Sequence, residues 1–198
     1  FPMGRMRMES TRDPSEGQKA NIVHWCPEDF EDHVAISWDF YPIQEPGLAI
    51  LFFCAKGREG EDIFDPSLEE RRGIYGKYHS GDINALHVSY FRRKHPHERA
   101  YQSCNLRKSH GFHLVAQGAD PLPSVQDAEA PYRVQMIKSG PHCVFGIGHE
   151  DRYLKLFHWV DDGESCGPVL TEGKIGFRQM CPLIAEYSNL KVRAVKSG

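Results

Sequence analysis

The stretch Gly173-Lys174-Ile175-Gly176-Phe177-Arg178-Gln179-Met180, followed by Ala185-Glu186-Tyr187-Ser188-Asn189-Leu190-Lys191-Val192, decides the fold of this chain. Alternation with a period of two is typical of β-strands that bury one face. The pattern predicts two closing strands, over 173–180 and 185–195. In the first, Ile175 and Phe177 lie on one face, while Arg178 and Met180 lie on the other.

The same alternation recurs through the rest of the chain, and long helical periodicity is almost absent. Residues 34–41 have an apolar face and a wetter face, whereas residues 48–55 are apolar on both faces, as expected of a central strand. One short helix is predicted at 65–71, with Asp65 as its cap and Pro66 in its first turn. Met6–Glu9 also has strand character, and further strands are predicted at 85–91, 111–116, 132–139, 143–149 and 153–159.

The composition is that of an ordinary globular protein. The 198 residues are 40% hydrophobic and 26% charged, with no linker or internal repeat, so we predict one domain over 1–198. No apolar run approaches the roughly 20 residues that span a bilayer, so the sequence predicts no membrane partner. Six cysteines without a Cys-x-x-Cys pair argue against a structural zinc site and favour reduced, mostly buried thiols. The sequence shows no signal peptide, so a cytoplasmic location is favoured. Phe1 is not an initiator, so a leader removed beforehand, and with it a periplasmic or secreted location, stays open.

Residues 89–113 form a basic window in an otherwise acidic chain. The window holds four Arg, two Lys and four His against the single acid Glu98, a net charge of +5, while the whole chain has −3. Guanidinium groups match carboxylate or phosphate geometry, and imidazole moves protons near neutral pH. Aromatic residues are interleaved with the charges, which favours folded strands over a solvated tail. The window therefore predicts an anion-binding surface.

The closing strands resemble the last hairpin of concanavalin A-like (lectin/glucanase) jelly rolls. The shared pattern is Gly-x-Ile-Gly-Phe in 173–177, then Asn-Leu-x-Val in 189–192. The resemblance implies an all-β fold, a two-sheet antiparallel jelly-roll sandwich. The chain would then carry one short helical excursion from this sandwich.

A closer resemblance covers nearly the whole chain. It is carried by runs such as Phe1–Glu9, Glu45–Leu48, His79–Asn84, Ser89–Arg93, Cys104–Ser109, Gly111–Pro121 and Gly173–Met180. Together they are similar to the YesU-like family, a domain-of-unknown-function group with a galectin-like jelly roll, found near bacterial genes for pectin breakdown. The resemblance implies a polysaccharide context but no particular reaction. It also implies that an N-terminal edge strand is missing here or supplied separately.

Strand geometry selects the candidate ligand-binding residues. In the strand that begins near residue 86, Leu86, Val88 and Tyr90 point to one face. The alternate residues point to the opposite, concave face, and they are His87, Ser89, Phe91 and Arg93. We expect residues from this strand, from the next and from the closing hairpin to converge on one groove. The predicted substrate-binding residues are His87, Arg93, Arg99, Asn105, Arg107, Gln117 and Arg178. For any single histidine, a plain surface or core role is about equally favoured.

Two acid–base schemes fit an acidic polysaccharide of plants or algae. A lyase neutralises the uronate carboxylate with Arg or Asn, removes the C5 proton and protonates the leaving oxygen. A glycosidase needs two placed carboxylates, and no pair is marked by spacing. The lyase is therefore preferred, with a hydrolase of oligosaccharide fragments and a non-catalytic galectin-like sugar-binding module as alternatives. The predicted proton-transfer residues are His113, then His110, Tyr101 and His97.

Other functional classes lack sequence support. No phosphate-binding loop, dinucleotide fingerprint or Gly-x-Ser-x-Gly elbow occurs. No cofactor or catalytic metal is predicted, although Glu61, Asp62 and Asp65 offer oxygens for a structural calcium. One short basic window in an acidic protein fits nucleic acid poorly. The predicted partner is an anionic oligosaccharide or polysaccharide, and a homo-oligomer stays open.

Overall fold

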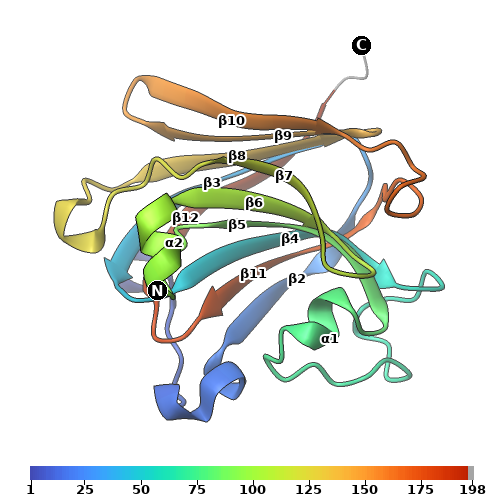
Figure 1. The fold of residues 1–198 in the computed structure, drawn as a ribbon, viewed down its shortest axis with the longest axis horizontal. Coiled ribbons are helices and arrows are strands. Elements are labelled where there is room, and N and C mark those ends of the chain that lie inside the picture. Colours follow the sequence, from blue (N-terminus) through green and yellow to red (C-terminus); the bar gives the residue numbers. More distant parts are fainter. Residues whose placement is uncertain (196–198) are drawn as a thin grey trace.

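A computed structural model of the chain describes residues 1–195 as two packed β-sheets (Figure 1). The strands are β1 (Met6–Met8), β2 (Ile22–Phe30), β3 (Val34–Gln44), β4 (Leu48–Gly57), β5 (Ile83–Tyr90), β6 (Ser103–Lys108), β7 (His113–Ala119), β8 (Tyr132–Ser139), β9 (His142–His149), β10 (Arg152–Val160), β11 (Gly173–Met180) and β12 (Ile184–Ala194). The first sheet has the order β1-β12-β3-β8-β9-β10, and the second sheet has the order β2-β11-β4-β5-β6-β7. All neighbours are antiparallel, which confirms the predicted jelly-roll sandwich.

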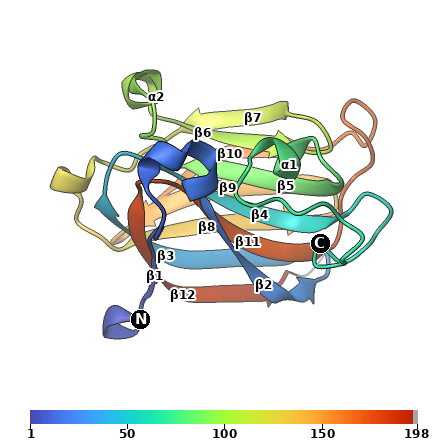
Figure 2. The same cartoon turned by 90° about the horizontal axis from the view of Figure 1, so that it is seen from below.

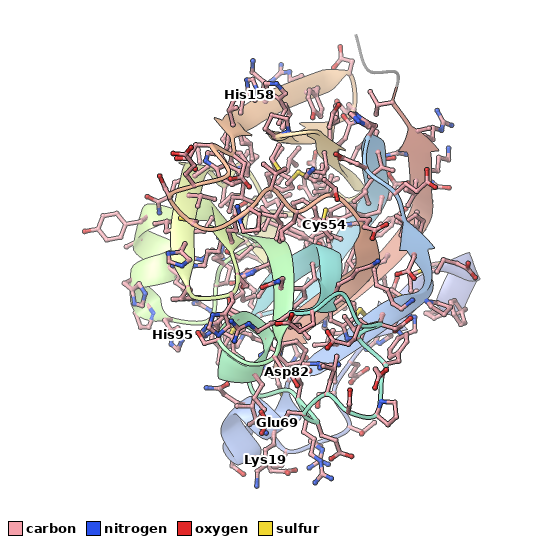
Figure 3. The ribbon with its side chains drawn as sticks, turned by 90° about the vertical axis from the view of Figure 1, so that its right-hand side faces the viewer. Lys19, Cys54, Glu69, Asp82, His95 and His158 are labelled. Carbon is pink, nitrogen blue, oxygen red and sulfur yellow. The ribbon has the colours of Figure 1, made fainter. Side chains whose placement is uncertain are left out.

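The core lies between the two sheets and is rich in aromatic rings. Trp38 of β3 packs edge-on against Phe177 of β11, with ring centroids 5.2 Å apart. Its indole nitrogen donates to the buried Tyr90 hydroxyl at 3.2 Å, so the one polar atom of the ring is satisfied. Cys54 also lies inside the sandwich (Figure 3), and all six cysteines are unpaired. This packing follows the alternation that placed Phe177 on the apolar face of its strand.

The outer face of the second sheet is also partly covered. The segment 58–82, which contains the short helix α1 (Gly76–His79), crosses over β4 and β5 (Figure 2). Ile63 and Tyr78 of this segment join Ile50 and Phe52 of β4 in a second apolar cluster. Strand β4 is therefore buried on both faces, which explains why its sequence lacks a polar side.

Helical structure is short and lies outside the predicted range. Residues 65–71 form turns, because the Asp65 carboxylate accepts from the Ser67 backbone at 2.8 Å and closes a tight local loop, so the prediction of a helix there is wrong. The α-helices are α1 and α2 (Pro96–Tyr101), and the 3₁₀ segments are η1 (Pro2–Gly4), η2 (Pro14–Ala20) and η3 (Val125–Asp127). Within residues 1–195, no helix has the length and apolar character needed to cross a membrane.

Candidate functional site

A pocket of about 270 Å³ lies on the outer face of the second sheet, beside the segment 58–82. We call it the β5–β6 pocket, because Ser89 of β5 and Asn105 and Arg107 of β6 supply much of its floor. Leu48 of β4 and Met180 of β11 complete that floor. The strand register pairs Ser89 with Asn105 and His87 with Arg107, so their side chains share the outer face while Leu86 and Val88 enter the core.

Three walls surround this floor. Arg92, His95 and Glu98, at the start of α2, stand at one end, and His95 is labelled in Figure 3. Gln18 of η2 closes a second side, where its amide oxygen accepts from the Tyr75 backbone at 2.6 Å.

The third wall is a contact between the segment 58–82 and the turn that joins β6 to β7. The Phe112 ring lies 5.6 Å from Tyr75 and 4.4 Å from His79, measured between ring centroids. The backbone of Gly111 donates to the His79 carbonyl at 2.6 Å and fixes the same contact. Two segments far apart in the sequence therefore meet across the outer face of the sheet.

A polar network lines the α2 end of the pocket. The Arg92 guanidinium contacts Glu98 at 3.0 Å and donates to the Ser103 hydroxyl at 2.7 Å. The carboxamides of Asn105 and Gln117 meet at 2.8 Å. The Asn105 amide fits best with its oxygen toward Arg92, at 2.9 Å. Glu98 is the one acid among the pocket-lining residues, and its charge is already used by Arg92.

Arg178 of β11 places an unpaired positive charge behind the pocket. Its side chain is 0% exposed and stacks near the rings of Tyr75 and Tyr78, at 5.0 and 5.1 Å from their centroids. Nη2 donates to the Gly73 carbonyl at 2.9 Å, whereas Nε and Nη1 have no partner in the described part of the chain. Burial lowers the pKa of Arg178 to about 10, so the group stays charged at neutral pH. A buried cation without a counter-charge is costly and raises the local positive potential.

Arg107 adds a second cation that faces the pocket. Its guanidinium lies 3.7 Å from the centre of the Phe112 ring and donates to the Phe112 carbonyl at 3.1 Å. Partial burial lowers the pKa of Arg107. The ring and the carbonyl hold the guanidinium in a fixed orientation.

Tyr75 and His87 form a hydrogen-bonded pair at the pocket wall. Tyr75 Oη and His87 Nε2 are 2.8 Å apart. Burial, followed by the positive charges of Arg107, His79 and Arg178, lowers the pKa of His87 to about 3. Burial also raises the pKa of Tyr75 to about 12, although the neighbouring arginines oppose the shift. At neutral pH the pair is therefore a neutral imidazole against a neutral phenol.

Several of the predicted binding residues come together here. Asn105 and Arg107 line the pocket, Gln117 bonds to Asn105, and His87 and Arg178 both contact Tyr75. Their roles in ligand binding stay predictions. Their grouping follows from the alternation on β5, β6 and β11.

Arg93 lies elsewhere, so the expectation that it faces the groove is wrong. Phe91 has a positive φ of 47°, which breaks the alternation at the end of β5 and turns both side chains inward. Arg93 is 2% exposed and pairs with buried Asp120 at 3.2 Å. It also donates to the Leu122 carbonyl at 2.6 Å, so it holds a loop rather than an open site.

The predicted proton-transfer residues are not in the β5–β6 pocket. His110 and His113 line another cavity, of about 420 Å³, at the far end of β5 and β6. The Phe112 contact stands between the two cavities. His97 is exposed and Tyr101 is 81% exposed on α2. Arg99, predicted to bind substrate, is about half exposed and contacts Glu45 at 3.4 Å.

Sequence reasoning missed Tyr75, Arg92 and the Gln18 wall. Arg92 lies in the basic window, but extending the β5 alternation selected its neighbour Arg93. The chain carried no local signal for Tyr75, because only the crossing of the segment 58–82 brings it over His87.

The proposed calcium oxygens are engaged in other contacts. Asp62 contacts Lys174 at 2.9 Å, and Asp65 closes the turn described above. Residues 1–195 contain no group of three or more His, Cys, Asp or Glu side chains that could hold a metal ion. A structural calcium stays a prediction.

Residues 1–192 match the family model described as Domain of unknown function (DUF1961). The chain belongs to the DUF1961 family. This DUF1961 chain is 58% identical over 174 residues to the protein YesU of Bacillus subtilis (strain 168). The aligned region covers 88% of this chain and 77% of YesU. The likeness to the YesU-like family seen in the sequence is thereby confirmed.

Solved structures place the DUF1961 fold among lectin-like sandwiches. A Bacillus subtilis protein of unknown function with a galectin-like fold aligns with a TM-score of 0.85 at 56% identity, over 89% of this chain and 79% of that one. The exoplasmic/lumenal domain of VIP36, in its Ca²⁺/Man3GlcNAc-bound form, aligns with a TM-score of 0.60 at 8% identity, over 98% of this chain and 80% of that one. The second likeness concerns the fold alone.

Proposed function

We propose that the β5–β6 pocket binds an acidic saccharide and holds its carboxylate with arginine. A carbohydrate-related role is supported by the galectin-like fold and by the sugar-bound form of VIP36. The finer proposal rests on the charge of the pocket. Arg92, Arg107 and Arg178 lie in or behind it, and the one lining acid, Glu98, is already paired.

The polar groups around these cations suit a sugar. Ser89, Asn105 and Gln117 offer hydroxyl and amide groups on the same side of the sheet, and such groups exchange hydrogen bonds with ring hydroxyls. Leu48 and Met180 provide an apolar strip at the floor. A polar rim around a small apolar patch, with a fixed guanidinium at one wall, matches one or two uronate units better than a neutral sugar.

Among enzymatic alternatives, the pocket favours elimination over hydrolysis. A glycosidase uses two carboxylates on either side of the scissile bond. Glu98 is the one acid lining the pocket, and its second oxygen accepts from the His95 backbone at 2.9 Å while the first contacts Arg92. An elimination requires a group that neutralises the carboxylate of the substrate and a group that carries protons. The pocket contains groups of both kinds.

Titration calorimetry with three probes of equal length tests this proposal. We expect tri-galacturonate to bind, its methyl ester to bind about tenfold more weakly, and neutral galactotriose to bind more weakly still, because a charge-assisted bond contributes about 1.5–3 kcal/mol. Equal binding of the neutral and acidic probes would instead identify a neutral-sugar lectin. Tri-glucuronate serves as a fourth probe, and failure of both tri-galacturonate and tri-glucuronate to bind would show that the proposal is wrong.

A matched pair of arginine variants locates the site. Arg107→Lys keeps the charge but loses the planar fork on Phe112, so we expect tri-galacturonate binding to weaken by about tenfold. Arg99→Lys is the control, because Arg99 lies outside the pocket and contacts Glu45. Equal affinities of the two variants would exclude Arg107 as the carboxylate anchor.

A further inference from the structure

Tyr75 and His87 form a hydrogen-bonded pair at the wall of the β5–β6 pocket. Tyr75 lines the β5–β6 pocket, and His87 lies directly behind it with 0% exposure. The 2.8 Å bond between the phenol oxygen and Nε2 is the polar contact of the ring, because Nδ1 has no partner among the described residues. The buried imidazole is therefore linked to the pocket by one hydrogen bond, to the Tyr75 hydroxyl.

The charges that face this pair prepare it for an anionic ligand. Arg178 and Arg107 approach it on the sheet side and His79 on the side of α1. Arg92 and Glu98 act on Tyr75 from the α2 end. Burial first, and then these cations, keep His87 neutral. A carboxylate held by Arg107 offsets them and raises the proton affinity of the imidazole at the moment when the ligand is in place.

We infer that the protein cleaves its acidic saccharide by β-elimination, with Tyr75 as the catalytic residue that moves protons and His87 as the positioning residue behind it. This inference rests on the proposed binding of a uronate in the same pocket. It differs from the sequence-based expectation, which assigned proton transfer to His113.

The proposed step conserves atoms and electrons. The C5–H bond of the uronate breaks, and its proton passes to Tyr75 Oη while that oxygen gives its own proton to His87 Nε2. The electron pair of the broken bond forms a C4=C5 double bond, and the C4–O bond breaks with departure of the oxygen substituent. That oxygen takes a proton from the Tyr75 hydroxyl, and His87 returns the proton it holds to Tyr75. Arg107 stabilises the charge that develops on the carboxylate during the step.

A tyrosine pair tests the catalytic role. Tyr75→Phe keeps the ring that packs on Phe112 but removes the hydroxyl, and Tyr101→Phe makes the same change on exposed α2. With tri-galacturonate and tri-glucuronate as probes, the ultraviolet absorbance of the conjugated double bond reports elimination. We expect Tyr75→Phe to lower kcat by about 10²–10⁴-fold with binding unchanged within about threefold, and Tyr101→Phe to keep wild-type rates.

His87→Gln tests the positioning role with a readout that folding alone does not change. The amide retains a hydrogen-bonding group near Tyr75 but cannot accept a proton. We expect kcat to fall by about tenfold or more at a similar KM, with loss of the acidic limb of the pH–rate profile. An unchanged profile in a folded variant would remove His87 from the mechanism.

The outcomes separate this inference from the proposed function. Wild-type protein that binds the acidic probes without any rise in absorbance would overturn the elimination and leave the binding proposal intact. Full activity of Tyr75→Phe would overturn the assignment of Tyr75. Failure of every acidic probe to bind would overturn the binding proposal and, with it, the elimination.

Discussion

His87 makes the stability of the folded protein depend on acidity. Its pKa is lowered from 6.5 to about 3 in the fold, by burial first and then by the charges of Arg107, His79 and Arg178. Between these values the unfolded chain binds more protons than the folded one. The free energy of unfolding therefore falls as the pH drops through this range. The stability contributed by neutral His87 is complete above pH 6.5 and is lost toward pH 3.

Urea unfolding at a series of pH values measures this effect. We expect His87→Gln to remove about 3 kcal/mol of the loss that the wild type suffers between pH 6.5 and pH 4, because one pKa unit corresponds to about 1.36 kcal/mol. His97→Gln, on exposed α2, should keep the wild-type slope. Identical slopes in all three proteins would contradict the buried, neutral state of His87.

Single residues also mark the limit of the sequence prediction. Alternation placed His87 correctly but failed six residues later at Arg93. One backbone angle, the positive φ of Phe91, reverses the faces that follow it. A positive φ in a large aromatic residue is rare and has no signature in the sequence. The buried partner Asp120 is equally hidden, because it lies on a loop 27 residues away.

The turn between β6 and β7 contributes to the pocket through Phe112. Its ring supports the Arg107 guanidinium from 3.7 Å and touches His79 of α1. We expect Phe112→Ala to weaken tri-galacturonate binding by about two- to fivefold, since a cation–π contact at an exposed site contributes about 0.5–1 kcal/mol. Calorimetry measures the change.

Leu114→Ala is the matched control for this element. The exposures of Phe112 and Leu114 are 46% and 45%, but only Phe112 lines the β5–β6 pocket. Truncation of Leu114 should therefore leave the affinity unchanged. If both variants lose the same affinity, the effect comes from a general loosening of the turn and not from the Arg107 support.

Strands were easier to predict than the segments that join them. The sequence of β4 is apolar on both faces, which predicts a strand that is covered on both sides. In the structure, Ile63 and Tyr78 cover its outer face. The segment 58–82 itself had no periodicity, and its turn residues suggested a helix at the wrong place. Strand β2 was missed as well, because Pro27 and the polar residues of this edge strand obscure its alternation.

At the scale of the molecule, the fold follows from local patterns and the pocket does not. Most strands of the sandwich carry their own pattern, so the sheets could be predicted largely strand by strand, with β2 and β6 as the exceptions. The pocket combines η2, the segment 58–82, the β6–β7 turn and the start of α2. Their meeting depends on topology and on contacts such as Gln18 with Tyr75. His158, on the first sheet, lies on the other side of the molecule from Glu69 and Asp82 of this segment (Figure 3).

If the pocket binds a uronate chain as proposed, its three walls determine how a long polymer approaches it. A site closed on three sides admits the terminus of a saccharide chain, whereas an open furrow would admit its middle. Binding should therefore follow the molar concentration of chain termini and not the mass of polysaccharide. Polygalacturonate cut to one tenth of its length should bind about ten times as much protein per gram at limiting ligand, as measured by calorimetry. Equal binding per gram would mean that internal units also enter. With termini as the recognised feature, the protein would act late in depolymerisation, when fragments outnumber intact chains.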